Sequence, residues 1–457
     1  MSMRLSRSIV GEAEAEAVRR VIVEDGYLGM GHETCLFEQE LAAYLGVAPG
    51  QVVTTNTGTA ALTLAVDAIA PREAARKPQI LVPSLTFVAS FQAIVAAGCE
   101  PVACDVLAGT GTIDLGDAAR RITPDTLAIM PVHYASNPWH LDEVHAFARE
   151  HGLRVIEDAA HAFGCLHHGR KIGRFGDVVC FSFDGIKNIT SGEGGCAVFF
   201  NATEAGYAAD ARLLSVEGDT LSRFAGTRTW DPDVKRIGWR FHMSNIMAAI
   251  GRVQLSRLDG EFIPALGDIY RRRLEGLEGL RLLQTDPQDF VVPHIVCVRV
   301  LDGRKDELKA ALTAAGIPVG VHYKPNHLLS LFRPAPGSLP LPVTEQLYGE
   351  LVTLPERRRC GTHLRRHHGH PGLTLSGNGA RPASCPGLPA RTAARMNLSS
   401  PSSRGTSMHH VPTSEAPVVS VIMNCLNSPV CILLIYQYRD LDLTGRDHID
   451  VNVGIIQ

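Results

Sequence analysis

Short apolar segments alternate with helix-like segments over residues 1–355, and this alternation constrains the fold more than any other feature of the chain. The apolar segments lie at residues 52–54, 80–82, 102–106, 127–132 and 153–157. The helix-like segments occupy residues 12–25, 57–70, 87–97 and 141–151. Strands that are apolar along their length are typical of sheets buried on both faces. The pattern predicts an α/β domain with a mixed, mostly parallel sheet that is covered by helices on both faces.

The alternation becomes less regular after Gly195. Helical periodicity covers residues 244–258 and resumes up to Leu277, and a strand over 294–300 precedes a helix over 306–315. This order of elements is typical of a smaller α+β domain. We therefore expect a large domain over residues 1–245 and a small domain over residues 246–355.

Composition changes abruptly in the last quarter of the chain. Residues 357–414 contain no Asp or Glu but nine arginines, and no lysine follows Lys324. Without a hydrophobic period this run is typical of disorder or of an out-of-frame translation, and a basic tail that binds an acidic partner is the alternative. Residues 418–436 are apolar but interrupted by Asn and Pro, which favours strands over a membrane span. We treat residues 356–457 as an atypical tail, disordered or frame-shifted.

The charge balance excludes some partners. The chain has 44 basic and 47 acidic residues, for a net charge of −3, whereas nucleic-acid or anionic-membrane binding needs clustered positive charge. We expect neither a nucleic-acid nor a membrane partner. The first residues, MSMRLSR followed by an acidic helix, do not resemble a signal, so a cytoplasmic location is expected.

Chemistry-bearing residues follow two of the apolar strands. The strand over residues 153–157 leads into Asp158, and the next apolar strand leads into Ser182 and, after a turn, Lys187. Ligands of open α/β sheets bind at the carboxyl ends of strands. A carboxylate and a lysine placed there could hold a pyridinium ring between them, or could form a plain ion pair at the rim of the sheet. On this spacing alone the two interpretations carry similar weight.

A phosphate site is also visible in the sequence. Thr57, Gly58 and Thr59 open a predicted helix directly after a strand. The first amides of a helix have no intrahelical acceptor and the helix dipole favours an anion there. This helix start is therefore a candidate for binding a phosphate group.

Several motifs in the same order carry a family resemblance. They are NTGTAAL, PSLTFVAS, EDAAHAFG and SFDGIKNITSGEGG, with GYLGMGHETCLFEQELAAYLG near the start and GIPVGVHYKPNH near the end. From about residue 4 to residue 355 the chain resembles the DegT/DnrJ/StrS family of pyridoxal-phosphate-dependent sugar aminotransferases. The resemblance implies a fold-type-I enzyme, with the cofactor pyridoxal 5'-phosphate bound by the large domain and no metal at the site.

The resemblance also implies roles for the matching residues. Lys187 would bind the cofactor covalently and move a proton, Asp158 would pair with the pyridine nitrogen, and His161 would lie near the ring hydroxyl. The other implied contacts to the phosphate or the ring face are Thr57, Gly58, Thr59, Phe87 and Ser182. The implied substrate contacts are His322 and Tyr323.

One motif departs from the family pattern. The family often has GYNYRM where the chain crosses to the phosphate of a partner subunit, and this chain has GWRFHM with Arg240 in place of the asparagine. Arginine binds phosphate well, so Arg240 is expected to keep the cofactor contact, and a solvated surface arginine is the alternative. The resemblance implies a homodimer with shared active sites.

The implied activity is transfer of an amino group, from L-glutamate, to a nucleotide-linked keto-sugar, yielding an amino sugar for a surface polysaccharide or a secondary metabolite. Related dehydratases have histidine at the position of Lys187, so the lysine favours amino transfer. A non-catalytic cofactor-binding or regulatory protein on the same scaffold is the alternative. A nucleotide-sugar dehydrogenase is disfavoured because no GxGxxG follows the first strand.

Overall fold

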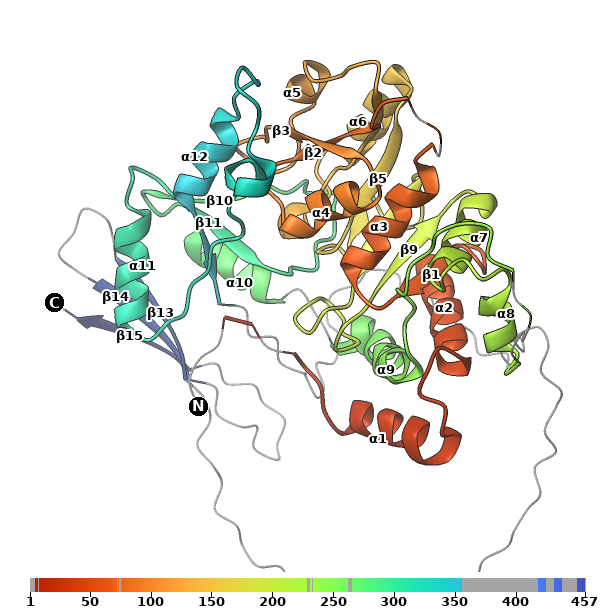
Figure 1. The fold of residues 1–457 in the computed structure, drawn as a ribbon. Helices are drawn as coiled ribbons and strands as arrows, with labels where there is room; N and C mark the ends of the chain where they lie inside the picture. Colours follow the sequence, from red (N-terminus) through yellow and green to blue (C-terminus); the bar gives the residue numbers. More distant parts are fainter. Residues whose placement is uncertain are drawn as a thin grey trace, which may run out of the picture.

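The structure is a computed structural model (Figure 1). It describes residues 5–6, 8–71, 73, 75–227, 231, 233–261, 265–355, 418–424, 431–437 and 450–456.

A seven-stranded sheet with the strand order β1-β9-β8-β5-β4-β2-β3 forms the centre of the large domain. Its strands are β1 (Val52–Thr55), β2 (Gln79–Pro83), β3 (Glu100–Cys104), β4 (Thr126–Ile129), β5 (Arg154–Asp158), β8 (Val178–Ser182) and β9 (Gly195–Phe199). Only β9 runs antiparallel to its neighbours in this sheet, and all other pairs are parallel. The predicted mixed, mostly parallel sheet is confirmed.

Helices cover both faces of this sheet (Figure 1). One face packs against α3 (Gly58–Ile69), α4 (Val88–Ala96) and α7 (Ala202–Ala211). The other packs against α2 (His32–Leu45), α5 (Leu115–Ala119), α6 (Leu141–His151) and α9 (Asn245–Glu261). In β8, Val178 and Cys180 enter the first core while Val179 and Phe181 enter the second, as the twofold period of a strand requires.

Shorter elements complete the large domain. They are α1 (Glu12–Arg20), the π-helical turn η1 (Val21–Asp25), α8 (Asp219–Phe224), the 3-10 turn η2 (Tyr134–Ser136), and the hairpin of β6 (Leu166–His167) and β7 (Arg170–Lys171). The helix predicted over residues 12–25 thus consists of α1 and η1.

The small domain has its own sheet and core. Strands β10 (Leu280–Leu282), β11 (Val296–Val300) and β12 (Leu351–Leu354) are antiparallel, in the order β10-β11-β12. Its helices are α10 (Ala265–Leu274), α11 (Lys305–Ala314) and α12 (Pro342–Glu350), and its 3-10 turns are η3 (Asn326–Leu328) and η4 (Ser330–Phe332). Val298, Leu312 and Val352 lie in its core. The boundary after residue 245 stays a prediction, because α9 begins there and packs into the core of the large domain.

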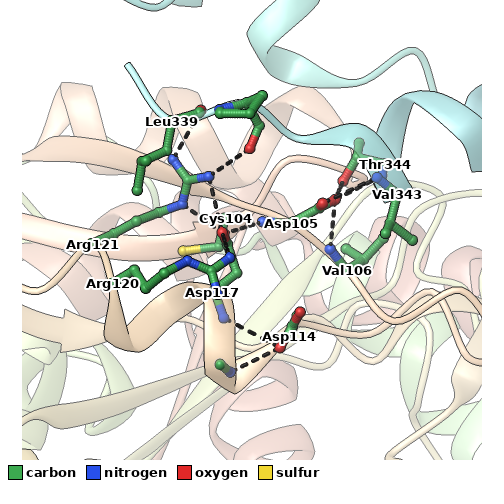
Figure 2. A network of polar contacts seen from close by, with 12 residues as sticks. Cys104, Asp105, Val106, Asp114, Asp117, Arg120, Arg121, Leu339, Val343 and Thr344 are labelled. Carbon is green, nitrogen blue, oxygen red and sulfur yellow. Dashed lines mark hydrogen bonds and ion pairs between the residues drawn. The ribbon is translucent and has the colours of Figure 1, made fainter. Parts of the chain in front are cut away.

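A buried polar network fixes α12 to the large domain (Figure 2). Asp105, directly after β3, accepts hydrogen bonds from the Thr344 amide and hydroxyl, both at 2.7 Å, and from the Val343 amide at 3.1 Å. These amides belong to the first turn of α12, where no intrahelical acceptor exists. A carboxylate of one domain therefore caps a helix of the other, which sets the position of the small domain over the sheet.

Three strands are described in the tail. Strands β13 (Val418–Asn424), β14 (Cys431–Gln437) and β15 (Asp450–Ile456) form an antiparallel sheet, and the first two fall in the region predicted to favour strands. The prediction of a disordered or frame-shifted tail covers residues 356–457 and stays a prediction; the acid-free run over residues 357–414 lies outside the described residues. Among the described helices, none combines the length and apolar character that a membrane crossing requires.

Candidate active site

The candidate site lies at the carboxyl ends of two adjacent parallel strands. Asp158 is the last residue of β5, and Ser182 is the last residue of β8, the strand beside it. The chain turns after Ser182 and presents Lys187, whose amide donates to the Asp184 carbonyl at 3.0 Å. The strand ends therefore deliver the acid and the lysine to one edge of the sheet, as the sequence predicted.

Asp158 is a buried carboxylate held by two donors. Its side chain is 5% exposed, and it accepts hydrogen bonds from the Ser90 hydroxyl at 2.7 Å and from the Ala160 amide at 3.2 Å. Ser90 lies in the first turn of α4, and its hydroxyl is 2.9 Å from the Thr86 hydroxyl. These two donors fix the orientation of the carboxylate. The Asp158 carboxylate is therefore oriented so that it can contact a positively charged group in the site.

Lys187 carries an amine whose titration is shifted towards neutrality. The residue keeps some exposed surface, but its amine lies among many protein atoms, and this desolvation lowers its pKa from 10.5 to about 8. The charges of Asp158 and Asp184 oppose the shift and do not cancel it. The Lys187 amine is also 3.3 Å from the His294 Nε2 atom. A lysine of this kind can act as a nucleophile and carry a proton near neutral pH.

His161 is buried beside the lysine. Burial, and then the nearby charge of Lys187, keep the pKa of His161 well below its ordinary value, so the imidazole is neutral. Its Nε2 atom is 3.1 Å from the Tyr323 hydroxyl, and its ring lies 4.3 Å from the His294 ring. Its Nδ1 atom is buried and has no hydrogen-bond partner among the residues that the structure describes. An unsatisfied buried nitrogen is costly, and a polar ligand atom would satisfy it.

An aromatic wall closes one side of the site. Phe87, at the start of α4, is 53% exposed, and its ring centroid lies 5.4 Å from that of Tyr323. Burial raises the pKa of the Tyr323 hydroxyl, which remains a neutral hydrogen-bonding group beside His161. The structure thus places Phe87, Tyr323 and His161 together, although the motifs that contain them are far apart in the sequence.

The start of α3 forms a tight cradle with Ser182. Thr57 is the N-cap residue, and its hydroxyl accepts a hydrogen bond from the Ala60 amide at 3.0 Å. This leaves the amides of Gly58 and Thr59 at the open end of the helix. A Cβ atom on Gly58 would lie 2.7 Å from the Ser182 Cβ atom, so only glycine allows this approach. The cradle offers two amides and a hydroxyl, a donor set that suits phosphate.

Arg240 and His322 occupy the margins of the site. Arg240 is exposed, and its carbonyl accepts a hydrogen bond from the Asn56 side chain at 3.4 Å, next to the start of α3. The His322 Nδ1 atom is 2.8 Å from the Thr353 hydroxyl on β12, and burial lowers the pKa of His322. The contacts predicted for both residues involve groups other than this chain, and both assignments stay predictions.

Three residues of the site are absent from the sequence-based assignment. Ser90 lies inside PSLTFVAS, three residues after Phe87, so helical spacing could have identified it. His294 comes just before β11, and no local signal points to it. Asn188 donates from its side-chain amide to the carbonyls of Phe163 at 2.8 Å and Val292 at 3.2 Å, which anchors the segment that carries His294.

The residues present fit pyridoxal phosphate. The start of α3 and Ser182 suit the phosphate, Asp158 suits a protonated ring nitrogen, and the unsatisfied Nδ1 of His161 suits a polar ring substituent. Lys187 suits the aldehyde carbon. The chemistry of the donor set therefore agrees with the cofactor that the motifs imply.

Comparisons with known proteins identify close relatives of this arrangement. A family model of the DegT/DnrJ/EryC1/StrS aminotransferases matches residues 8–363. A protein of Saccharopolyspora spinosa named dTDP-4-dehydro-2,3,6-trideoxy-D-glucose 4-aminotransferase is 35% identical over 362 residues, which cover 77% of this chain and 91% of the relative. The crystal structure of the aminotransferase TlmJ from Streptoalloteichus hindustanus has a TM-score of 0.70 and 30% identity, with coverage of 77% and 93%. That of AtS13 from Actinomadura melliaura has a TM-score of 0.69 and 32% identity, with coverage of 78% and 93%.

Proposed function

The chain belongs to the DegT/DnrJ/EryC1/StrS aminotransferase family, and on that premise we propose that the site around Lys187 transfers an amino group from L-glutamate to the keto carbon of a nucleotide-linked sugar. The expectations of fold type I, of pyridoxal phosphate as cofactor and of a nucleotide-sugar transaminase are confirmed. The observation that carries the assignment to this site is the position of Lys187 beside the carboxyl ends of β5 and β8, which end at Asp158 and Ser182; the lowered pKa of its amine agrees with this role.

Each group of the site has a task in this proposal. Pyridoxal phosphate, when bound, supplies an aldehyde that carries the amino group and a pyridinium ring that withdraws electrons from the reacting carbon. The amides of Gly58 and Thr59 and the Ser182 hydroxyl hold the phosphate. Asp158, fixed by Ser90, keeps a proton on the ring nitrogen. Phe87, exposed beside Tyr323, would pack against the ring face.

Proton transfer is the task of Lys187. Amino transfer requires a proton to leave one carbon and return to another, and the same amine can take and give it because its pKa lies close to neutral pH. His294, 3.3 Å from the amine, positions it through a hydrogen bond. We assign His294 as a positioning residue, because its contact is with Lys187.

The oligomeric state, the substrate and the location of the enzyme are further parts of the proposal. Exposed Arg240 lies beside the phosphate cradle, where a second subunit could receive its guanidinium, so we propose a homodimer with shared sites. His322 and Tyr323 are proposed as substrate contacts, because Tyr323 lies beside His161 and Phe87 and His322 precedes it in the chain. The S. spinosa relative is named as a 4-aminotransferase of a dTDP-linked keto-sugar, and we propose a substrate of the same class, in the cytoplasm.

A spectroscopic titration tests the proposal. The full chain loaded with pyridoxal phosphate should absorb visible light, and addition of L-glutamate should bleach this band as the cofactor accepts the amino group. Lys187→Ala should show neither the lysine-bound band nor bleaching. A visible band that does not respond to glutamate or to any other amino-acid donor would refute amino transfer and favour a non-catalytic cofactor-binding protein.

A further inference from the structure

A second cluster of titratable side chains lies outside the site described above. It combines Asp142 at the start of α6, His167 and His168 on the β6–β7 hairpin, and Asp286 and Asp289 in the segment between β10 and β11. One ligand atom from each of Asp142, His167 and His168 lies within 4.8 Å of the other two. Nothing in the proposed transamination uses these residues.

Each histidine of the cluster is held by its own carboxylate. The His167 Nδ1 atom is 2.8 Å from Asp289 Oδ1, and the His168 Nε2 atom is 3.3 Å from Asp286 Oδ2. The opposite ring nitrogens both face the Asp142 Oδ2 atom, from His167 Nε2 at 3.4 Å and from His168 Nδ1 at 3.3 Å. Carboxylates that bind one nitrogen of a histidine and direct the other towards a shared point are the usual outer contacts of metal ligands.

Burial supplies a second observation. The His167 side chain is 2% exposed, and its Nε2 atom, 3.4 Å from Asp142 Oδ2, makes no hydrogen bond within the described part of the chain. Asp289, which is fully buried, lies against Nδ1, so Nε2 is the ring nitrogen that faces the cluster. His168 and Gly169 have φ values of 47° and 77°, the positive values that a two-residue hairpin turn requires, and the His168 ring stacks on the His167 ring.

We propose that this cluster binds one Zn²⁺ ion through His167 Nε2, His168 Nδ1 and Asp142 Oδ2. Zinc bonds of about 2.0–2.1 Å in tetrahedral geometry separate neighbouring ligand atoms by roughly 3.3–3.4 Å. The two separations from Asp142 Oδ2 match this value. Asp142 and His168 are partly exposed, so they can move to close the site and a water molecule can supply the fourth ligand.

A cation near the cluster does not block the site. The Arg170 guanidinium is 3.4 Å from Asp142 Oδ1, whereas the two histidines contact Oδ2, and the guanidinium also lies over the Phe175 ring. Oδ2 therefore stays available to an ion. The arginine also reduces the local negative charge, which favours a single divalent cation over the accumulation of several.

The ion would connect three segments that are distant in the sequence. The hairpin already pairs with the segment between β10 and β11, through hydrogen bonds between Leu166 and Phe290 at 2.8 and 2.9 Å. The same segment continues to His294 beside Lys187. Zinc would therefore act as a structural link that holds the entry to the small domain against the large domain, with no part in the chemical step.

Metal titration of the cofactor-loaded full chain tests the proposal. After treatment with a chelator, the chain is titrated with Zn²⁺ alone by calorimetry, and with Co²⁺ to record its visible absorption bands. His168→Gly removes a ligand at a backbone conformation that suits glycine, and Asp142→Ala removes an exposed ligand. Glu143→Ala is the matched control, since Glu143 is the exposed acid next to Asp142 and pairs with His140 instead. Histidines of the tail are present in every variant, so their contribution cancels.

We expect the wild type and Glu143→Ala to bind one more equivalent of Zn²⁺ than His168→Gly or Asp142→Ala, and to gain thermal stability on binding. Asp286→Asn, which weakens the outer contact of His168 alone, should lower the affinity by about 10–100-fold. Tetrahedral Co²⁺ bands should appear only where the extra equivalent binds. Equal stoichiometry and equal thermal shifts in the wild type, His168→Gly and Asp142→Ala would overturn the proposal.

Discussion

The titration of Lys187 gives a quantitative prediction about how the chain captures its cofactor. Only the neutral amine attacks the aldehyde of pyridoxal phosphate, so the rate of capture should follow the neutral fraction of Lys187. Burial lowers the pKa of this amine from 10.5 to about 8. At pH 7 the neutral fraction is then about 9%, against about 0.03% for an unshifted amine, a gain of about 300-fold.

The sign of the pH dependence follows from this shift. Below pH 8 the protonated amine predominates, so the capture rate should rise about tenfold per pH unit, and above pH 8 it should level off. Asp184→Asn should move the start of the plateau to lower pH, because the negative charge of Asp184 raises the pKa of Lys187. Asparagine keeps an oxygen that can accept the hydrogen bond from the Ile186 amide, at 3.2 Å in the wild type.

Stopped-flow mixing of the cofactor-free chain with pyridoxal phosphate measures this rate through the growth of visible absorbance. The titrations of the cofactor itself are common to both chains, so a difference between the wild type and Asp184→Asn belongs to the protein. Lys187→Ala defines the background from other lysines. A capture rate that still rises tenfold per unit above pH 9, or a plateau that is the same in Asp184→Asn, would refute the reasoning.

Three further predictions concern the catalytic groups and the tail. Lys187→Ala should fold, but its transamination rate should fall by at least about three orders of magnitude. Borohydride reduction of the wild type should attach the mass of the cofactor to the peptide that contains Lys187. Cofactor attached to a different peptide would contradict the role of Lys187. Asp158→Asn should retain the cofactor but slow the proton-transfer steps by about two orders of magnitude or more, because an amide cannot keep the ring nitrogen protonated. Single-turnover kinetics near the wild-type rate would reject this role of Asp158. Limited proteolysis should rapidly trim the chain to about its first 355 residues and leave a cofactor-binding core. The reason is that the acid-free run lacks the apolar periodicity that would offset an ordering entropy of about 1–2 kcal/mol per residue. A protease-resistant unit over residues 356–457 would show that the tail is a genuine domain.

The parts of the fold that were predictable are encoded over short stretches. The strands that end at Asp158 and Ser182 are apolar runs that the sheet buries on both faces, and both residues lie at the edge where the sequence placed them. Helix α2 is absent from the predicted elements, although Phe37, Leu41 and Leu45 recur every four residues and are buried. Periodicity was therefore informative there as well and would have identified the helix.

The unpredicted parts depend on contacts between distant segments. His294 reaches Lys187 only because β11 and the segment before it pack against the hairpin after Gly164. Asp105 caps α12 across the domain boundary, and no pattern near either residue indicates this pairing. The histidine–aspartate cluster is similar, because its members come from three segments whose spacing in the sequence does not match a metal-binding motif. Such sites become visible only when the fold has brought the segments together.

If Lys187 carries out the amino transfer proposed above, nitrogen must move from an amino acid to a nucleotide-linked keto-sugar at this residue. The most direct test incubates the cofactor-loaded chain with L-glutamate labelled with a heavy nitrogen isotope and with a panel of keto-sugar nucleotides, and follows the sugars by mass spectrometry. We predict that the label enters at least one sugar nucleotide with the wild-type chain, and enters none with Lys187→Ala. A wild-type chain that binds the cofactor and exchanges nitrogen with glutamate, yet labels no sugar nucleotide across dTDP-, UDP- and GDP-linked keto-sugars, would contradict the account.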